Sequence, residues 1–181
     1  MRSVETTEAH ESDELLNIQT NFLERLASGA SVQESLDHLC GAIEGLVPNS
    51  VCSVMYFEPK QGVLQIRSAP HAPQRLCEKL DGLVPADHAA SCGTAAYRGE
   101  AVIVADTQID PRWADYREVA REYGIRACWS LPEFCYGELL GTFAISLSEA
   151  RTPTPLELRM LQTGCHLAGI GISRVRADEQ R

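Results

Sequence analysis

The hydrophobic positions near the start of the chain repeat with the spacing of amphipathic helices. Apolar residues recur every three or four positions over residues 15–26, which predicts a helix that begins near Ser12 or Asp13 and ends at Gly29. A second apolar stripe covers residues 32–46 and follows a serine that can cap the helix. The chain therefore begins with two helices that each have one apolar face.

The middle of the chain is built from short segments of strand composition. The predicted strands lie at residues 51–57, 63–67, 101–105, 127–131 and 139–146. Between them we expect a partly helical connection at residues 69–90 and helical segments at 91–97 and 110–120. Strands in consecutive hairpins with helices inserted between them favour an α+β fold, in which an antiparallel sheet is covered on both faces.

The last helix has the clearest signature. Thr154 can cap it, Pro155 occupies its first position and Glu157 completes a capping box. Apolar residues then alternate at spacings of three and four, as in a heptad seam. With the first helix they predict a two-fold dimer interface, although one amphipathic helix on its own sheet explains the first half of the seam equally well. The predicted interface residues are Leu15, Phe22, Leu158, Leu161, Cys165, Ala168, Ile172 and Val175.

The length of the chain, 181 residues, is that of one domain that can bury a core without disulfide or metal staples. Polar and acidic residues concentrate at both ends. We expect a disordered acidic tail at residues 1–11 and a single domain at residues 12–175. Residues 176–181 then form a charged tail or the start of a linker to an output domain.

The charge of the chain limits its partners. A formal net charge of -9 and a sequence pI near 5.0 argue against nucleic-acid binding, which requires clustered Lys and Arg. The start lacks the apolar core of a signal peptide, and no stretch has the roughly 18 to 20 apolar residues of a membrane span. We expect a cytoplasmic protein without a membrane partner.

The seven cysteines are scattered, with no CxxC pair and no other close metal-ligand spacing. Their number is odd, so a complete disulfide framework is not indicated. They are interpreted as reduced thiols that are mostly buried. We expect no metal site.

One segment carries a family resemblance. Residues 91–100 read SCGTAAYRGE and precede the strand at 102–104 and Asp106, a pattern that resembles the central signature of GAF domains. DPRW at 110–113, YGIRACWSLP at 123–132 and LGTFA at 140–144 continue the match, as does Tyr116. The resemblance runs from about Leu15 to the last helix. It is to the GAF branch of bacterial sensors, which often stands ahead of histidine kinases or of domains that make or degrade cyclic-di-GMP.

The resemblance implies a fold and a function. A GAF domain has a central antiparallel sheet of about five to six strands, with the terminal helices on one face as a dimerisation bundle. A ligand cavity, covered by short helices and loops, lies on the other face. Such a domain binds a small molecule and passes a conformational change to an output domain. Here that domain would be of the GGDEF, EAL or histidine kinase type, in cis or in trans.

Several residues are candidates for the ligand site. A short helix beginning near Ser91 would direct backbone N–H groups into the cavity, where they could hold an anionic or carbonyl group. Alternatively, Ser91 only caps that helix and Thr94 packs beneath a strand. Aromatic side chains could form apolar walls or belong to the ordinary core. The candidate ligand-binding residues are Tyr56, Ser91, Cys92, Gly93, Thr94, Asp106, Trp113, Tyr116, Cys128 and Trp129.

The ligand class follows from what the site lacks. No basic cluster lies near the predicted pocket, which disfavours a cyclic dinucleotide and favours a small metabolite or a monoanion such as nitrate, which a related GAF branch senses. His71 and His88 lie in the connection over the pocket and could ligate haem, but loop histidines are more commonly surface residues. We expect no cofactor.

Two alternatives remain open. One GAF lineage is a free methionine sulfoxide reductase, and Cys92 matches the position of one of its cysteines. That family also has a cysteine just before the residue aligned with Asp106, where this chain has Ala105. We therefore expect no enzymatic activity and assign no catalytic residue. The other alternative is a ligand-free dimerisation module whose cavity is filled by side chains such as Trp129 and Tyr56.

Overall fold

The fold is organised around one antiparallel sheet of five strands in the order β2-β1-β5-β4-β3. The computed structural model describes the backbone of residues 2–181 and the side chains of residues 4–181. The strands are β1 (Ser50–Glu58), β2 (Val63–Ser68), β3 (Val102–Val104), β4 (Ala127–Cys135) and β5 (Glu138–Leu147). Their pairing is antiparallel between all neighbours, which confirms the predicted α+β class and antiparallel sheet.

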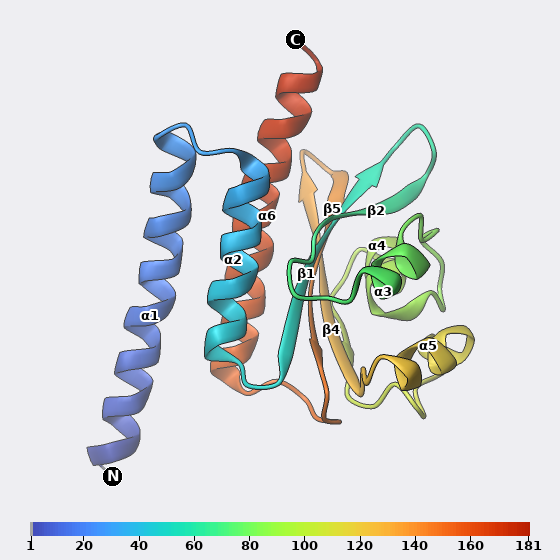
Figure 1. Cartoon of the computed structure of the whole chain (residues 1–181), viewed down its shortest axis with the longest axis horizontal. Coiled ribbons are helices and arrows are strands. Elements are labelled where there is room, and N and C mark those ends of the chain that lie inside the picture. Colours follow the sequence, from blue (N-terminus) through green and yellow to red (C-terminus); the bar gives the residue numbers. More distant parts are fainter. Residues whose placement is uncertain (1) are drawn as a thin grey trace.

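Three long helices cover one face of the sheet (Figure 1). They are α1 (Arg2–Ala27), α2 (Val32–Leu46) and α6 (Pro155–Glu179). Helices α2 and α6 pack directly on the strands, and α1 lies outside them as a further layer. The close approach of α6 depends on Gly164, because a Cβ atom there would lie 2.5 Å from Cε1 of Phe143. None of the described helices has the length and apolar character of a membrane span.

Short helices cover the opposite face of the sheet. They are α3 (Gln74–Leu80), α4 (Ala90–Arg98), the 3-10 helix η1 (Pro111–Tyr116) and α5 (Arg117–Glu122). Helix α4 packs against β4 and β5, and η1 packs against α4. Terminal helices on one face and short helices on the other are the predicted arrangement, which the structure confirms (Figure 1).

Both ends of the chain are more helical than the sequence predicted. Helix α1 begins at Arg2 rather than near Ser12, so it includes the segment predicted as a disordered tail; Met1 lies outside the described residues. Residues 4–10 are exposed all round, so no apolar stripe marks them, yet they contain no proline or glycine to stop a helix. Helix α6 likewise continues to Glu179. The domain limits at 12–175 stay a prediction.

The predicted dimer seam lies largely within the single chain. Phe22, Leu161, Cys165, Ala168 and Ile172 are buried in the core between the helices and the sheet. The three-and-four spacing of α6 is therefore explained by packing on its own sheet, which needs the same stripe as a helical partner. The other predicted seam residues, Leu15, Leu158 and Val175, are half-buried.

A homodimer stays a prediction, and its interface would have to use other side chains. The large apolar residues that stay exposed on the long helices are Leu16, Leu23, Val4 and Ile170. The first two lie seven residues apart on α1, which places them on one side of that helix. An interface built from them would run along the outer surface of α1 rather than along α6 alone.

Candidate ligand-binding cavity

A cavity of about 170 Å³ lies between the sheet and the short helices. Its floor is the sheet face that points away from α2 and α6, and its cover is built by α3, α4 and η1 together with their connections. The floor residues are Val51, Ser53 and Met55 of β1, Cys128 of β4, and Ala144 and Ser146 of β5. The covering residues include Leu76, Cys77, Leu80, Ser91, Cys92 and Trp113.

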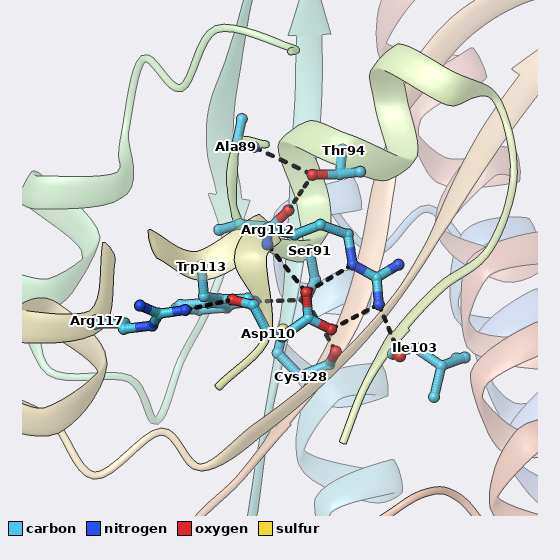
Figure 2. Close-up of polar contacts among 10 residues, drawn as sticks. Ala89, Ser91, Thr94, Ile103, Asp110, Arg112, Trp113, Arg117 and Cys128 are labelled. Carbon is cyan, nitrogen blue, oxygen red and sulfur yellow. Dashed lines mark hydrogen bonds and ion pairs between the residues drawn. The ribbon is translucent and has the colours of Figure 1, made fainter. Parts of the chain in front are cut away.

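The start of α4 is shaped by Thr94 and Gly93. The Thr94 hydroxyl donates to the Ala90 carbonyl at 2.5 Å and accepts from the Ala89 N–H at 3.1 Å (Figure 2). Ala90 has a φ of 56°, in the left-handed region, and this pair of bonds holds it there. A Cβ on Gly93 would lie 3.2 Å from Cδ2 of Leu83, so glycine lets the preceding loop pack on the helix. Both residues therefore position α4, and neither lines the cavity.

Ser91 joins three elements around the cavity. The Trp113 indole N–H donates to Ser91 Oγ at 3.0 Å, and Ser91 Oγ donates to the Cys128 carbonyl at 2.9 Å (Figure 2). This chain ties η1 to α4 and α4 to β4, and all three residues are buried. Tyr116 packs against Trp113 edge-to-face at a centroid distance of 6.4 Å. The cavity wall is thus fixed by hydrogen bonds that are already satisfied without a ligand.

An acidic cap fastens η1 to the edge strand. The Asp110 carboxylate accepts from the Arg112 N–H at 3.0 Å and from its guanidinium at 2.9 and 2.7 Å. Arg112 also donates to the Ile103 carbonyl, and Arg117 donates to the Asp110 carbonyl (Figure 2). The hydrogen bonds from Arg112 lower the pKa of Asp110. Its carboxylate therefore caps η1 and orients Arg112.

Two of the three thiols that line the cavity, Cys92 and Cys128, are held in their neutral form. Burial raises the pKa of Cys128 to about 12, and burial also raises the pKa of Cys92. Their sulfur atoms accept weak hydrogen bonds from Ser146 and Ser130, at 3.5 and 3.4 Å. A thiol that stays protonated at neutral pH is a poor nucleophile. These groups contribute apolar surface to the cavity.

The structure brings four of the predicted ligand residues to the cavity, namely Ser91, Cys92, Trp113 and Cys128. Tyr116 lies behind Trp113 and does not line it. Asp106 accepts from the Gln108 N–H at 3.0 Å and pairs with Arg126 at 3.4 Å, so it serves the turn after β3.

Trp129 and Tyr56 lie on the wrong face of the sheet for this role. Successive residues of a strand point to opposite faces, so Trp129 must point away from the cavity that its neighbour Cys128 lines. Its indole N–H donates to the Arg151 carbonyl at 3.1 Å, and the Arg151 guanidinium lies 5.1 Å from the ring centre. Tyr56 is similarly placed between Arg67 and Arg176.

Sequence reasoning missed most of the apolar lining. The alternation along β1 that turns Tyr56 away from the cavity could have predicted that Met55 lines it. Helical spacing in α3 could likewise have placed Leu76 and Leu80 on one face of that helix. The polar residues of the lining are all uncharged and include Ser53, Ser146 and Ser148. Among the described residues, no charged side chain lines the cavity.

Metal or haem ligands are not gathered at this site. Within the described part of the chain, no three His, Cys, Asp or Glu side chains come together as a metal site would require. His71 contacts Glu44 at 2.6 Å, and neither it nor His88 lines the cavity.

The chain belongs to the GAF domain family, whose model matches residues 31–172. A methyl sulfide methyltransferase-associated sensor of the archaeon Methanosarcina acetivorans is 37% identical over 177 residues. The match covers 97% of this chain but 18% of that protein, so this chain corresponds to a small part of its relative. The relative is archaeal, and the expected links to bacteria and to cyclic-di-GMP signalling stay predictions.

Solved structures with the same fold come from diverse proteins. The GAF domain of a Coxiella burnetii phosphoenolpyruvate-protein phosphotransferase has a TM-score of 0.75 at 20% identity, covering 93% of this chain and 98% of that one. A domain of a putative sensor histidine kinase from Sinorhizobium meliloti reaches 0.66 at 21% identity, over 84% and 98%. A free methionine-R-sulfoxide reductase from Neisseria meningitidis reaches 0.70 at 14% identity, over 94% and 92%. At these identities the likeness shows the fold.

Proposed function

We propose that this chain is the ligand-binding sensory domain of a signalling protein, and that its cavity takes a small, uncharged and mainly apolar molecule. The observation that supports this most directly is the 170 Å³ cavity, whose described lining has no charged side chain. The kinship with a sensor supports the signalling role. A cavity of about 150 Å³ lined by apolar residues is known to admit benzene, which sets the scale of the ligand.

The charge of the ligand is limited by the same lining. Moving an ion from water into apolar surroundings without a partner is costly, and the start of α4 offers only partial positive charge from its free N–H groups. Ser91 and Cys92, the second and third residues of that helix, line the cavity, so one neutral acceptor such as a carbonyl or sulfoxide oxygen could bind there. This favours an uncharged metabolite over the monoanion considered from sequence.

The signal would leave through the helical face. We propose that ligand binding shifts α2 and α6, which lie on the other side of the sheet, and that a homodimer or an output domain responds. A histidine kinase or a GGDEF or EAL domain, in cis or in trans in the cytoplasm, is the kind of output proposed. Such coupling requires that the ligand bind one of two conformations more tightly.

The proposal is tested by thermal unfolding of the chain with dimethyl sulfide, toluene, nitrate and cyclic-di-GMP. The name of the archaeal relative makes methyl sulfides the first class to try. A ligand at one hundred times its dissociation constant adds about 2.7 kcal/mol to stability. We expect stabilisation by an uncharged molecule, lost in Ala144→Leu, which fills the cavity, and kept in Ala114→Leu, which is exposed on η1. Stabilisation by nitrate alone would reject the proposed ligand class.

The two alternatives have less support. Reductase activity would need a thiolate, whereas burial raises the pKa of all three thiols that line the cavity, Cys77, Cys92 and Cys128. In addition, Ala105 stands where that family has a second cysteine. A ligand-free module with a filled cavity would need Trp129 and Tyr56 in the cavity, and both pack on the other face. Absence of thiol-dependent turnover of methionine sulfoxide is the expected result of a direct assay.

A further inference from the structure

A short connection on the cavity cover also contacts the helical face. The last residue of β2, Ser68, and the connection from it to α3 are together called the rim segment below, residues 68–73. Ala69, Ala72 and Pro73 line the cavity from it. Figure 1 shows the same connection passing beside α2 before it enters α3. The rim segment therefore has one side on the cavity and one side on a helix of the opposite layer.

Two side chains bind the rim segment to α2. His71 Nδ1 lies 2.6 Å from Glu44 Oε2, and its ring lies over α2 where a Cβ on Gly41 would be 3.6 Å from Cε1. Ser68 Oγ donates to Asp37 Oδ1 at 2.6 Å, three residues earlier along the rim segment. The two contacts lie seven residues apart on α2, so they hold points about two turns apart on the same helix face.

Glu44 also links α2 to the sheet. Its Oε1 accepts the backbone N–H of Cys52 in β1 at 2.9 Å, while its Oε2 contacts His71. The carboxylate is nearly buried, whereas the imidazole is 62% exposed. A pair that is open to water on one side is weak enough to break and reform. If His71 moves away, Glu44 keeps its bond to the Cys52 N–H, and only Ser68 still joins the rim segment to α2.

The rest of the cover is tied elsewhere. Lys79 of α3 pairs with Glu122 of α5, Ser91 of α4 bonds to β4, and Arg112 of η1 bonds to β3. Among the described parts of the cover, only the rim segment makes side-chain hydrogen bonds to a helix of the other layer. A displacement of the cover by a ligand would therefore reach α2 through Ser68 and His71.

We infer that the rim segment is the element that transmits occupancy of the cavity to α2, with Ser68 and His71 as positioning residues. This rests on the proposed function, because it requires that the cavity be occupied. Binding moves or fixes the rim segment, and its two side chains pass the change to α2. Helix α2 packs on α1 and α6, so the change reaches the helices that would join an output domain.

The test is hydrogen exchange followed by mass spectrometry on the full chain, with toluene as the probe. In the unmodified protein, toluene should slow exchange in α4 and in residues 37–44 of α2, by about fivefold or more if the coupling is of ordinary strength. In Ser68→Ala/His71→Ala, α4 should still respond and α2 should not. The control Lys79→Ala removes an exposed pair within the cover, and both segments should respond as before. Unfolding curves show that each variant is folded.

The outcomes separate the two proposals. An α2 response that survives in Ser68→Ala/His71→Ala, or an α4 response without any α2 response in the unmodified chain, would overturn the transmission route and leave the cavity proposal standing. If toluene changes neither segment, the proposed ligand class fails, and Ala144→Leu then serves as a built-in occupant. A change of α2 exchange in Ala144→Leu that disappears when Ser68 and His71 are also replaced supports the route. If exchange in α2 is the same in Ala144→Leu as in the unmodified chain, the transmission route is overturned.

Discussion

Replacing Ser91 by alanine tests whether the wall of the cavity is held by the hydrogen-bond chain through that residue. The Ser91 side chain is completely buried, and its hydroxyl lies between the Trp113 indole N–H and the Cys128 carbonyl. Alanine removes one acceptor and one donor without adding volume. The buried indole N–H is then left without a partner, which costs about 1–3 kcal/mol.

We expect Ser91→Ala to lower the free energy of unfolding by about 2 kcal/mol, the middle of that range. For a domain of this size each kcal/mol shifts the melting temperature by roughly 2–4 °C, so the expected loss is about 4–8 °C. The assay is urea and thermal unfolding followed by circular dichroism. Ser130→Ala is the matched control, because Ser130 is equally buried but donates only to the Cys92 sulfur, a weak acceptor.

A double-mutant cycle identifies the partner. Trp113→Phe removes the indole N–H, so the loss from Ser91→Ala should be about 1 kcal/mol smaller in that background than in the unmodified chain. If the two losses add to within about 0.3 kcal/mol, or if Ser91→Ala costs no more than Ser130→Ala, the link from Trp113 to Ser91 does not hold the wall.

Three further predictions follow from the same region. Burial raises the pKa of Cys128 to about 12, from an ordinary thiol pKa of 9.0, so the neutral thiol stabilises the fold fully below pH 9. That contribution falls as the pH rises toward 12, and Cys128→Ala should flatten the alkaline limb of a stability–pH curve; an unchanged limb would contradict this. Gly93→Ala should lower stability by about 1–3 kcal/mol in urea unfolding, because its Cβ would lie 2.6 Å from that of Ala89; a neutral effect would show that the loop adjusts freely. The hydrogen bonds from Arg112 lower the pKa of Asp110, so Asp110→Asn should lower the free energy of unfolding by about 0.5–1 kcal/mol at neutral pH. The difference in unfolding free energy between this variant and the unmodified chain should shrink as the pH falls through the pKa of folded Asp110, which lies below 3.8. A difference that is constant at all pH values would mean that charge is not involved.

The helix boundaries that depend on local chemistry were predictable from sequence. Thr154 accepts from the Glu157 N–H while the Glu157 side chain accepts from the Thr154 N–H, which is the predicted capping box. Ser31 likewise accepts from the Glu34 N–H at 3.1 Å. These contacts span three residues, so the sequence contains all of the information they need. The start of α1 was missed because the side chains of residues 4–10 are all exposed, so no apolar stripe marks these turns in the sequence.

The cavity was predictable only in part, for a reason visible at residues 128 and 129. The sequence prediction placed both Cys128 and Trp129 in the ligand site, although neighbours on one strand point to opposite faces. Deciding which one faces the cavity requires knowing which face α6 covers. The buried Trp129 is the larger side chain, and it fills the space beneath the loop at Arg151. The volume of each side chain and the helices that cover the sheet together decide which residue faces the cavity. Only the side-chain volume can be read from a single segment of sequence.

The chemistry of the lining was harder still to foresee, because it is assembled from segments far apart in the chain. The sequence around Ser91 suggested an anion site, since a helix start offers free N–H groups. In the fold, that helix start faces Met55, Leu76 and Ala144, which come from β1, α3 and β5. Apolar neighbours raise the cost of burying an ion more than one short helix can offset, so the same N–H groups suit a neutral acceptor. The charge of the proposed ligand is thus limited by residues outside the motif that suggested the site.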